Sequence, residues 1–515
     1  MEAKEGYGCG NKNDPISHYK IVRSNELRYI TRVRNMEFEE YELQRLFGHE
    51  AAEDEDPQRL KEYYFKSKTY KQVVNDLPLR IVVGHKGIGK SALFQVAIDE
   101  ETENNRLTLL IKPDDIIGIG EDTNDFLKLI RDWKAGINEI IAKKALTSFG
   151  MVFDGWRGKL NQYGGAALDF LASTLKTDDK VNLSASKEAI LKDFLQYNKI
   201  SVYIDDLDRG WQGRKHDIQR ISALLNAVRD ISTENRGIYF RVSLRSDVYY
   251  LARTSDESTD KTEGSVIWYS WSNHEILVLL VKRIESFFGR EVNEKELLSK
   301  HQSELMRYLE QIIEEKFTGK GHWRDAPMYR VLMSLIRKRP RDLVKLLTLA
   351  GRQANTNSSE KITTGALESI FEEYSQGRLQ DTINEYRSEL PEVEKLILGM
   401  RPSKVQRKAS QGYVYTTEQL LKKLRAIEEQ GKYRWANGTQ VDTKGLAAFL
   451  YKINFITARK KVSNGIDRKY FEENRYLSNK FTEFGYDWEV HPAYRWALQP
   501  EDPMQIFNEL ELSAS

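Results

Sequence analysis

The stretch that decides the fold is LRIVVGHKGIGKSALF, residues 79–94. It opens with a short, largely apolar and β-branched run, which is typical of a buried strand in a parallel sheet. The GxxxxGKS pattern of residues 84–91 follows, and an apolar helical pattern begins directly after it. Strand, glycine-rich loop and helix in this order predict a phosphate-binding loop, in which backbone N–H groups and a helix N-terminus face an anion.

The residue types of this loop suit a nucleoside triphosphate with its magnesium ion. Lys90 would place its ammonium between the β- and γ-phosphates, and Ser91 would give its hydroxyl to Mg²⁺. We therefore expect ATP or ADP as the ligand, with Mg²⁺ as the cofactor. The predicted nucleotide-binding residues of the loop are Gly84, His85, Lys86, Gly87, Ile88, Gly89, Lys90, Ser91 and Ala92.

Acidic residues follow another strand-like run, VYIDD at residues 202–206. Asp205 would hold Mg²⁺ through water, and Asp206 would orient or deprotonate the water that attacks the γ-phosphate. Together with Lys90, Asp206 would belong to the catalytic set of a slow ATPase. The competing interpretation of this run is a polar loop after a core strand, without a catalytic role.

A third strand-like run, FRVSLRSD at residues 240–247, also ends in polar side chains. Ser243 and Arg245 are candidates for sensing the γ-phosphate, and Arg245 completes the predicted catalytic set. The competing interpretation is a surface arginine that pairs with Asp247 or Asp208.

The order of the patterns predicts the domain organisation. Strand-like runs alternate with helical patterns up to about residue 270, and helical spacing continues alone to about residue 395. We predict an α/β fold: a P-loop NTPase with a doubly wound parallel sheet, followed by an α-helical lid and a C-terminal winged-helix-like domain. The expected ranges are an N-terminal extension or adaptor at 1–75, the ATPase core at 76–270, the lid at 271–398 and the winged-helix-like domain at 399–515.

Composition excludes several classes of protein. The chain has 515 residues, 30% of them charged, a net charge of +2 and one cysteine, Cys9. One cysteine cannot form an internal disulfide, which fits a reducing compartment. Because no apolar run approaches the ~20 residues that span a bilayer and the N-terminus lacks an apolar signal core, we expect a cytoplasmic protein without a membrane partner.

These motifs resemble the AAA+/STAND branch of P-loop ATPases, which includes origin-recognition ATPases and NLR-type immune switches. The run 205–209 is similar to an Asp-rich signature of bacterial STAND-like and KAP-like ATPases, and the helix start at 339–344 resembles the sensor-2 helix of AAA+ lids. The resemblance implies that Arg341 reaches the nucleotide; a surface arginine at a helix N-terminus is the alternative. It also implies that His491 touches the β-phosphate of ADP as a resting-state lock, although Pro492 departs from the family pattern. A histidine that is satisfied by local hydrogen bonds is the alternative.

More narrowly, the chain resembles bacterial P-loop ATPases of defence islands and phage-related contexts. The resemblance rests on aromatic cues at 62–66, 267–272 and 449–456, and His85 replaces an arginine expected in the loop. It implies a molecular switch in anti-phage defence that forms a homo-oligomer and activates a separate effector protein. The alternatives are a DNA-binding AAA+ ATPase of origin-recognition or remodelling type, and a non-catalytic ATP-dependent scaffold.

Residues 401–480 are locally basic. They contain 18 Lys and Arg against 7 Asp and Glu, with tyrosine and tryptophan interleaved. This pattern indicates possible contact with DNA or RNA, with residues 459–461 and 468–469 around Gly465 as the wing. The competing interpretation is a solvated face that also packs on the ATPase core.

Overall fold

A five-stranded parallel sheet forms the centre of the α/β domain. The computed structural model describes residues 36–513 except 149–198 and shorter gaps at 105, 122, 124, 212, 236, 256, 409–411, 464, 476, 478–484 and 500–502. The strand order is β2-β3-β4-β1-β5. The P-loop NTPase fold that the sequence predicts is confirmed. The strands are β1 (Leu79–Gly84), β2 (Leu107–Ile111), β3 (Ile200–Ile204), β4 (Ile238–Arg245) and β5 (Val266–Trp268).

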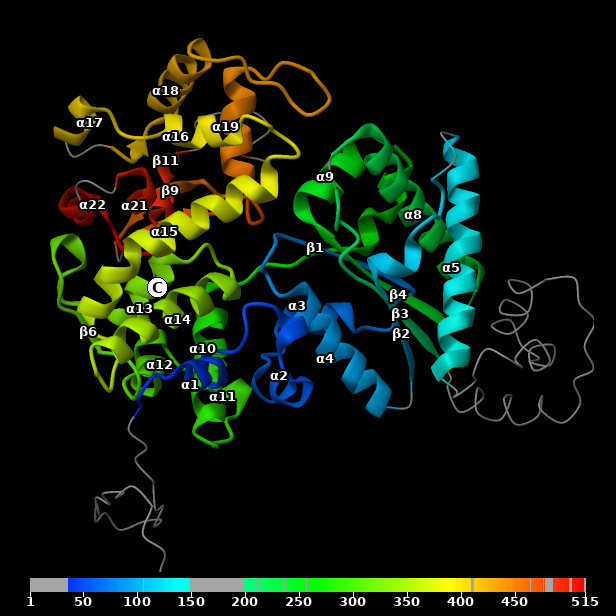
Figure 1. Ribbon diagram of the computed structural model, residues 1–515, viewed down its shortest axis with the longest axis horizontal. Helices are drawn as coiled ribbons and strands as arrows, with labels where there is room; N and C mark the ends of the chain where they lie inside the picture. The colour runs from blue at the N-terminus through cyan, green and yellow to red at the C-terminus, as the bar shows by residue number, and fades with distance from the viewer. Residues whose placement is uncertain are drawn as a thin grey trace, which may run out of the picture.

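Helices cover both faces of the sheet because side chains alternate along each strand. Ile81 and Val83 of β1 belong to one buried cluster, which α5 (Phe126–Ser148), α8 (Lys215–Glu234) and α9 (Ser246–Ser255) complete. Val82 belongs to the opposite cluster together with α4 (Lys90–Glu103). Figure 1 shows α5, α8 and α9 on one side of the strands and α4 on the other.

The region after the core is helical, apart from a short strand pair that the sequence analysis missed, β6 (Lys316–Phe317) with β7 (Ala326–Pro327). Its helices are α10 (Asn273–Phe287), α11 (Glu294–Ser299), α12 (Gln302–Leu309), α13 (Met328–Leu335), α14 (Pro340–Thr356) and α15 (Thr364–Tyr386). A capping box between Ser272 and Glu275 begins α10.

The described part of the N-terminal segment packs on this helical region. Its helices are α1 (Glu40–Phe47), α2 (Pro57–Tyr63) and α3 (Lys68–Val73). Helix α1 contacts α10 and α14. Leu43 of α1 lies so close to Gly351 of α14 that a Cβ on the glycine would be 2.4 Å from the leucine Cδ2. The adaptor predicted at 1–75 therefore shares a core with the lid over its described part; Cys9 lies outside the described residues.

The C-terminal region has the predicted order of two helices followed by a hairpin. A capping box between Thr416 and Gln419 begins the first helix. The elements are α16 (Val393–Gly399), α17 (Lys404–Lys408), β8 (Val414–Tyr415), α18 (Thr417–Glu429), α19 (Thr443–Lys452), β9 (Ile456–Val462), β10 (Gly465–Lys469), β11 (Asp487–Val490), α21 (Arg495–Leu498) and α22 (Pro503–Glu509).

Strand β9 pairs along both of its edges. The hairpin joins β9 to β10, while β11 pairs with the other edge of β9 and with β8. The strand order is β10-β9-β11-β8. In the part of the chain that the structure describes, every helix is too short or too polar to span a bilayer.

Two helical glycines test the packing of the N-terminal segment on the lid. Gly351→Val should lower the free energy of unfolding by about 1–3 kcal/mol, because the added methyls overpack the contact with Leu43. Gly377→Ala in α15 is the matched control: a Cβ there meets nothing within 4 Å, so the change should stabilise by up to about 1 kcal/mol. Urea unfolding measures both; equal effects of the two substitutions would contradict the packing of α1 on α14.

Candidate functional site

The glycine-rich loop has the backbone bend that its sequence predicts. Gly87 and Gly89 have φ values of +77° and +101°, which favour glycine, and α4 begins at Lys90. A Cβ on Gly87 would be 3.1 Å from the side chain of Arg341. The loop therefore passes directly from β1 into a helix whose N-terminus is suited to an anion.

A cavity of about 1100 Å³ lies at the carboxyl ends of the strands, next to this loop. That is the place where parallel α/β sheets bind ligands. Its lining joins residues that are far apart in the sequence. From the loop come Lys86, Gly87, Gly89, Lys90, Ser91 and Ala92; from the strand ends Asp205, Asp206, Asp208, Ser243 and Arg245; from the lid Pro340, Arg341 and Val344; and from the N-terminal segment residues 49–54 with Leu60, Tyr63 and Tyr64.

Lys90 is held by its own loop. Its Nζ donates to the carbonyl oxygens of Gly84 and His85, at 2.9 and 3.2 Å. Burial lowers the pKa of Lys90, and the Asp208 and Asp205 carboxylates oppose this shift. The ammonium thus lies between the loop and the acidic strand end, on the wall of the cavity.

The aspartates at the end of β3 differ in their surroundings. Asp205 accepts a hydrogen bond from the hydroxyl of Ser243 on β4. Asp206 has a positive φ of 58°. Burial raises the pKa of Asp206, and the Asp208 and Asp205 carboxylates reinforce the shift, which makes Asp206 a stronger base. Asp208, which was not predicted as a site residue, also lines the cavity. Burial raises the pKa of Asp208, and the positive charges of Arg245 and Lys90 oppose this shift.

These groups fit a magnesium ion that is shared with phosphates. Within the described ranges, no three His, Cys, Asp or Glu side chains form a metal cluster. Mg²⁺ in nucleotide sites typically takes one or two protein oxygens and completes its shell with phosphates and water. Ser91 and Asp205 both line the cavity and supply a hydroxyl and a carboxylate, which is the donor set that such sites use.

Arg245 forms the pair that the competing interpretation expected. Its guanidinium donates to both carboxylate oxygens of Asp247, at 3.1 and 2.7 Å, and lies 3.4 Å from Asp208. It also donates to the carbonyl of Glu385, at 2.7 Å. Arg245 nevertheless lines the cavity, so contact with a γ-phosphate remains a prediction.

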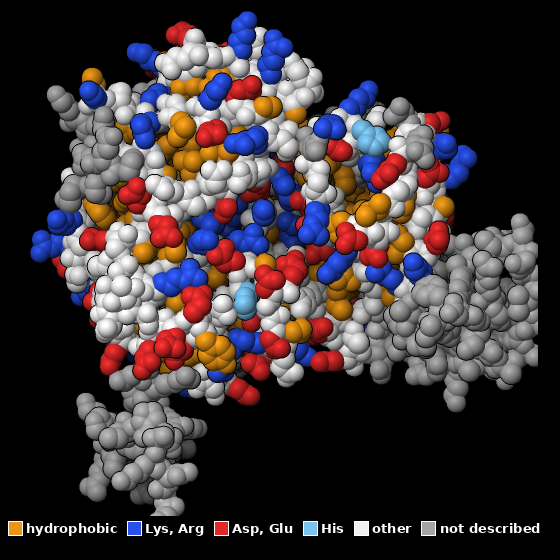
Figure 2. Space-filling view, viewed as in Figure 1, with side chains coloured by type: hydrophobic (Ala, Val, Ile, Leu, Met, Phe, Trp, Pro, Cys, Tyr) orange, Lys and Arg blue, Asp and Glu red, His pale blue; other side chains and the backbone are white. Residues whose placement is uncertain are grey.

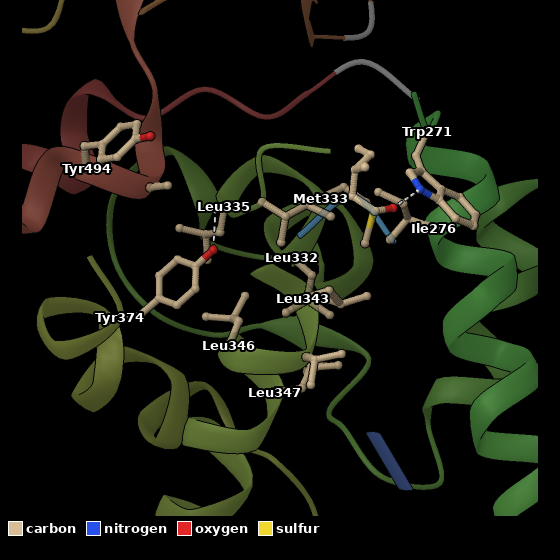
Figure 3. Packing of buried hydrophobic residues seen from close by; sticks show 14 of the residues in the cluster. Trp271, Ile276, Leu332, Met333, Leu335, Leu343, Leu346, Leu347, Tyr374 and Tyr494 are labelled. Carbon is tan, nitrogen blue, oxygen red and sulfur yellow. Dashed lines mark hydrogen bonds between the residues drawn. The ribbon is translucent and has the colours of Figure 1, made fainter. Parts of the chain in front are cut away.

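Residues from the lid hold the outer side of the loop, a contact that was not predicted from the sequence. The backbone N–H of Lys86 donates to the Glu385 carboxylate at 3.2 Å, and Arg339 donates to the Lys86 carbonyl at 3.3 Å. Trp271 donates from Nε1 to the Ile88 carbonyl at 2.9 Å, in the packing shown in Figure 3. Arg339 begins the run 339–344 and Trp271 belongs to the aromatic run 267–272, but neither run predicts a contact with the loop, and nothing in the sequence marks Glu385.

His85 does not face the cavity, although it was predicted to bind the nucleotide. Its ring is 2% exposed and Nδ1 lies 2.7 Å from the Tyr386 hydroxyl at the end of α15. On the other side, Nε2 contacts Glu472 and lies 3.2 Å from the Asn454 side-chain nitrogen. The His85 ring points away from the cavity because the bend of the loop turns this side chain outward, into a polar network with the C-terminal region. Gly84 and Ile88 do not line the cavity either.

The two residues that the family resemblance suggested have different positions. Arg341 lies across Gly87 and lines the cavity, and its Nε donates to the Glu50 carbonyl at 2.9 Å. His491 is fully buried away from the cavity, where its Nδ1 accepts from the Ala493 N–H at 3.1 Å and its Nε2 lies 2.8 Å from the Tyr470 hydroxyl. His491 is therefore satisfied by local hydrogen bonds, as the alternative to the resting-state lock expected, and it makes no contact with the loop residues that line the cavity.

The predicted basic wing is partly internal. Arg468 is buried and donates to the Glu489 carboxylate, and Arg459 lies 3.2 Å from Glu511. Lys460 and Lys461 are exposed. Two of the five predicted wing cations are therefore neutralised inside the fold. Figure 2 shows blue and red side chains together in the hollow between the two halves of this face.

The chain is similar to several known proteins. Residues 274–383 match the family described as the FunZ-associated C-terminal helical domain. A curated relative from Escherichia coli strain K12, the putative transposon gamma-delta 80.3 kDa protein, is 22% identical over 91% of this chain and 70% of its own length. The Aeropyrum pernix ORC2 protein with ADPNP and ADP matches 88% of this chain and 92% of its own, at 10% identity and a TM-score of 0.40. The Aeropyrum pernix ORC1 protein in complex with DNA matches 86% of this chain and 91% of its own, at 11% identity and a TM-score of 0.32.

Buried His491 predicts a pH dependence of stability. Burial lowers the pKa of His491 well below its usual value, so the folded protein keeps the ring neutral. Below the unfolded pKa of about 6.5 the unfolded chain binds a proton that the folded chain does not, which lowers the free energy of unfolding by about 1.4 kcal/mol per pH unit. The charged and titratable groups around the ring are Arg337, Asp342, Arg468, Tyr470 and Arg495.

Urea unfolding between pH 7 and pH 5 measures this effect. His491→Gln should make the loss of stability with falling pH less steep, and the same substitution at exposed His322 should leave the slope unchanged. An unaltered slope in His491→Gln would contradict a neutral, buried ring.

Proposed function

We propose that this chain binds ATP with Mg²⁺ and hydrolyses it slowly, and that the bound nucleotide acts as a switch. The observation that carries the proposal is the cavity next to the loop, whose wall combines Lys90 and Ser91 with Asp205 and Asp206. A lysine at the loop end, a helix N-terminus and two strand-end carboxylates are together suited to a triphosphate and its divalent cation.

Each residue has a role in this proposal. Mg²⁺, when bound, would neutralise charge on the phosphates. Ser91 and Asp205 would hold it, and Lys90 would leave its loop carbonyls to meet the β- and γ-phosphates. Asp206 would accept the proton of the attacking water. Arg245 would release part of its contact with Asp247 to meet the γ-phosphate.

The contacts on the outer side of the loop support the switch. Lys86 and His85 lie on the loop, and their partners Glu385 and Tyr386 lie at the end of α15, while Asn454 belongs to the C-terminal region. A loop that is reshaped by phosphates would shift these contacts, because both sides use the same short backbone segment. The nucleotide would thereby bias the position of the C-terminal region.

The cellular role in this proposal is that of a STAND-like switch in bacterial anti-phage defence. The protein would form a homo-oligomer and activate a separate effector. The name of the Escherichia coli relative places that protein in a transposon, which supports a connection with mobile genetic elements. The family matched by residues 274–383 includes α14, at whose start Arg339 and Arg341 contact the loop, and it ends before Glu385.

A DNA-binding ATPase is the second candidate, because exposed cations remain in the C-terminal region. They precede or directly follow the inward-facing Arg459 in the sequence, and such residues would contact phosphates with salt-dependent affinity. The exposed ones are Arg401, Lys404, Lys422, Arg425, Lys432, Arg434, Lys444, Lys460 and Lys461.

Lys90→Ala should abolish ATP binding in isothermal titration calorimetry, with a loss of affinity of at least a hundredfold. The substitution removes the ammonium that would contact two phosphates, and with it the donor to the Gly84 and His85 carbonyls of the loop. Lys71→Ala, at an exposed position of α3 outside the cavity, is the matched control and should bind ATP as the unchanged protein does. Tight binding by Lys90→Ala would refute the assignment of the loop.

Asp206→Asn should retain ATP binding and lose hydrolysis by at least a hundredfold, because an amide cannot accept the proton of the attacking water. Phosphate release under single-turnover conditions measures this loss. Hydrolysis at the unchanged rate would remove Asp206 from the mechanism, and no hydrolysis in the unchanged protein would favour the non-catalytic scaffold. Stimulation by duplex DNA that disappears at high salt would favour the DNA-binding candidate.

A further inference from the structure

A second cavity lies between the ATPase core and the C-terminal region. Its volume is about 430 Å³, within the range of sites that bind small molecules. Ile218 of α8 and Tyr250 of α9 form one side, and α19 with the segment before it forms the other. This cavity shares no lining residue with the cavity at the phosphate loop.

Aromatic rings form much of the wall. Trp435 and Phe449 contact each other with ring centroids 5.5 Å apart and planes at 69°. Tyr250 and Phe471 also line the cavity. Such walls bind a flat ring by stacking and edge contacts, at little cost in side-chain entropy.

One ion pair provides the polar part of the wall. Lys452 Nζ lies 2.6 Å from Glu389 Oε1, and both side chains are less than a tenth exposed. The second carboxylate oxygen, Glu389 Oε2, has no hydrogen-bond partner among the described residues. A buried carboxylate oxygen without a donor is costly, so this atom would gain from a ligand N–H.

The pair presents a donor beside an acceptor. The ammonium has three N–H groups and the carboxylate accepts only, so the complementary ligand edge carries a carbonyl next to an N–H. Among purine bases, that edge is the lactam of guanine and hypoxanthine, and guanine directs a second N–H, from its amino group, at the same carboxylate. Adenine presents an acceptor ring nitrogen beside a donor amino group, so it meets this pair only with its ring turned over and with a single N–H-bearing group on the carboxylate.

We propose that this second cavity binds a free purine nucleoside or related small molecule with a lactam edge, with its ring between the aromatic side chains and its lactam on Lys452 and Glu389. The site is separate from the cavity at the phosphate loop, since the loop contributes nothing to its wall. A ligand held there would contact the ATPase core and the C-terminal region at once.

Isothermal titration of the full chain with guanosine tests the site, with adenosine as the matched ligand. Guanosine should bind one to one, both with and without saturating ADP, and adenosine should bind at least tenfold more weakly. Equal affinity for the two nucleosides, or binding of guanosine that ADP abolishes, would overturn the proposal. Binding of a guanine-bearing oligonucleotide without binding of guanosine would also overturn it.

Two variants locate the binding. Glu389→Gln replaces the free acceptor with a donor and should weaken guanosine at least tenfold, whereas Glu394→Gln, an exposed carboxylate outside the cavity, should have no effect. Ala448→Phe fills the cavity from α19 and should remove guanosine binding. Circular dichroism and thermal unfolding confirm that each variant is folded; unchanged guanosine affinity in either folded cavity variant would contradict the assigned site.

Discussion

Five successive carbonyl groups of the phosphate loop must find donors, and the rest of the structure depends on how they do so. The Lys90 ammonium donates to the carbonyls of Gly84 and His85. The other three donors come from later in the chain: Arg339 for the Lys86 carbonyl, the Arg341 backbone N–H for Gly87, and Trp271, just before α10, for Ile88. Peptide groups left without partners in such a buried bend would be costly. The loop is therefore held from outside by residues more than 180 positions further along the chain, while its inner side borders the cavity that Asp205 and Asp206 line.

This arrangement places the loop between two regions of different chemistry. On one side, Asp205, Asp206 and Asp208 form an acidic wall beside Lys90 and Arg245. On the other, His85 contacts Tyr386, whose ring lies 6.2 Å from that of Phe449 in the wall of the second cavity. A continuous set of packed side chains thus joins the two cavities, and a change at either one has a physical route to the other.

The sequence predicts what is local and misses what is remote. The loop, the strand ends that carry Asp205 and Ser243, and the helix that begins beside Arg341 follow from patterns of a few residues. The orientation of His85 depends on Tyr386 and Glu472, which come from distant parts of the chain, so no local pattern contains it. The inward turn of Arg468 was missed for the same reason: Glu489, two strands away, is buried beside it.

Hydrogen–deuterium exchange with and without a non-hydrolysable ATP analogue and Mg²⁺ tests the central claim most directly. If the loop is shared by the nucleotide and the C-terminal region, exchange should slow in residues 84–91 and should also change at 385–389 and 452–455, where the outer partners lie. Unchanged exchange in the loop would contradict nucleotide binding at this cavity. Protection that stops at the loop, with residues 385–389 and 452–455 unaffected, would contradict the coupling.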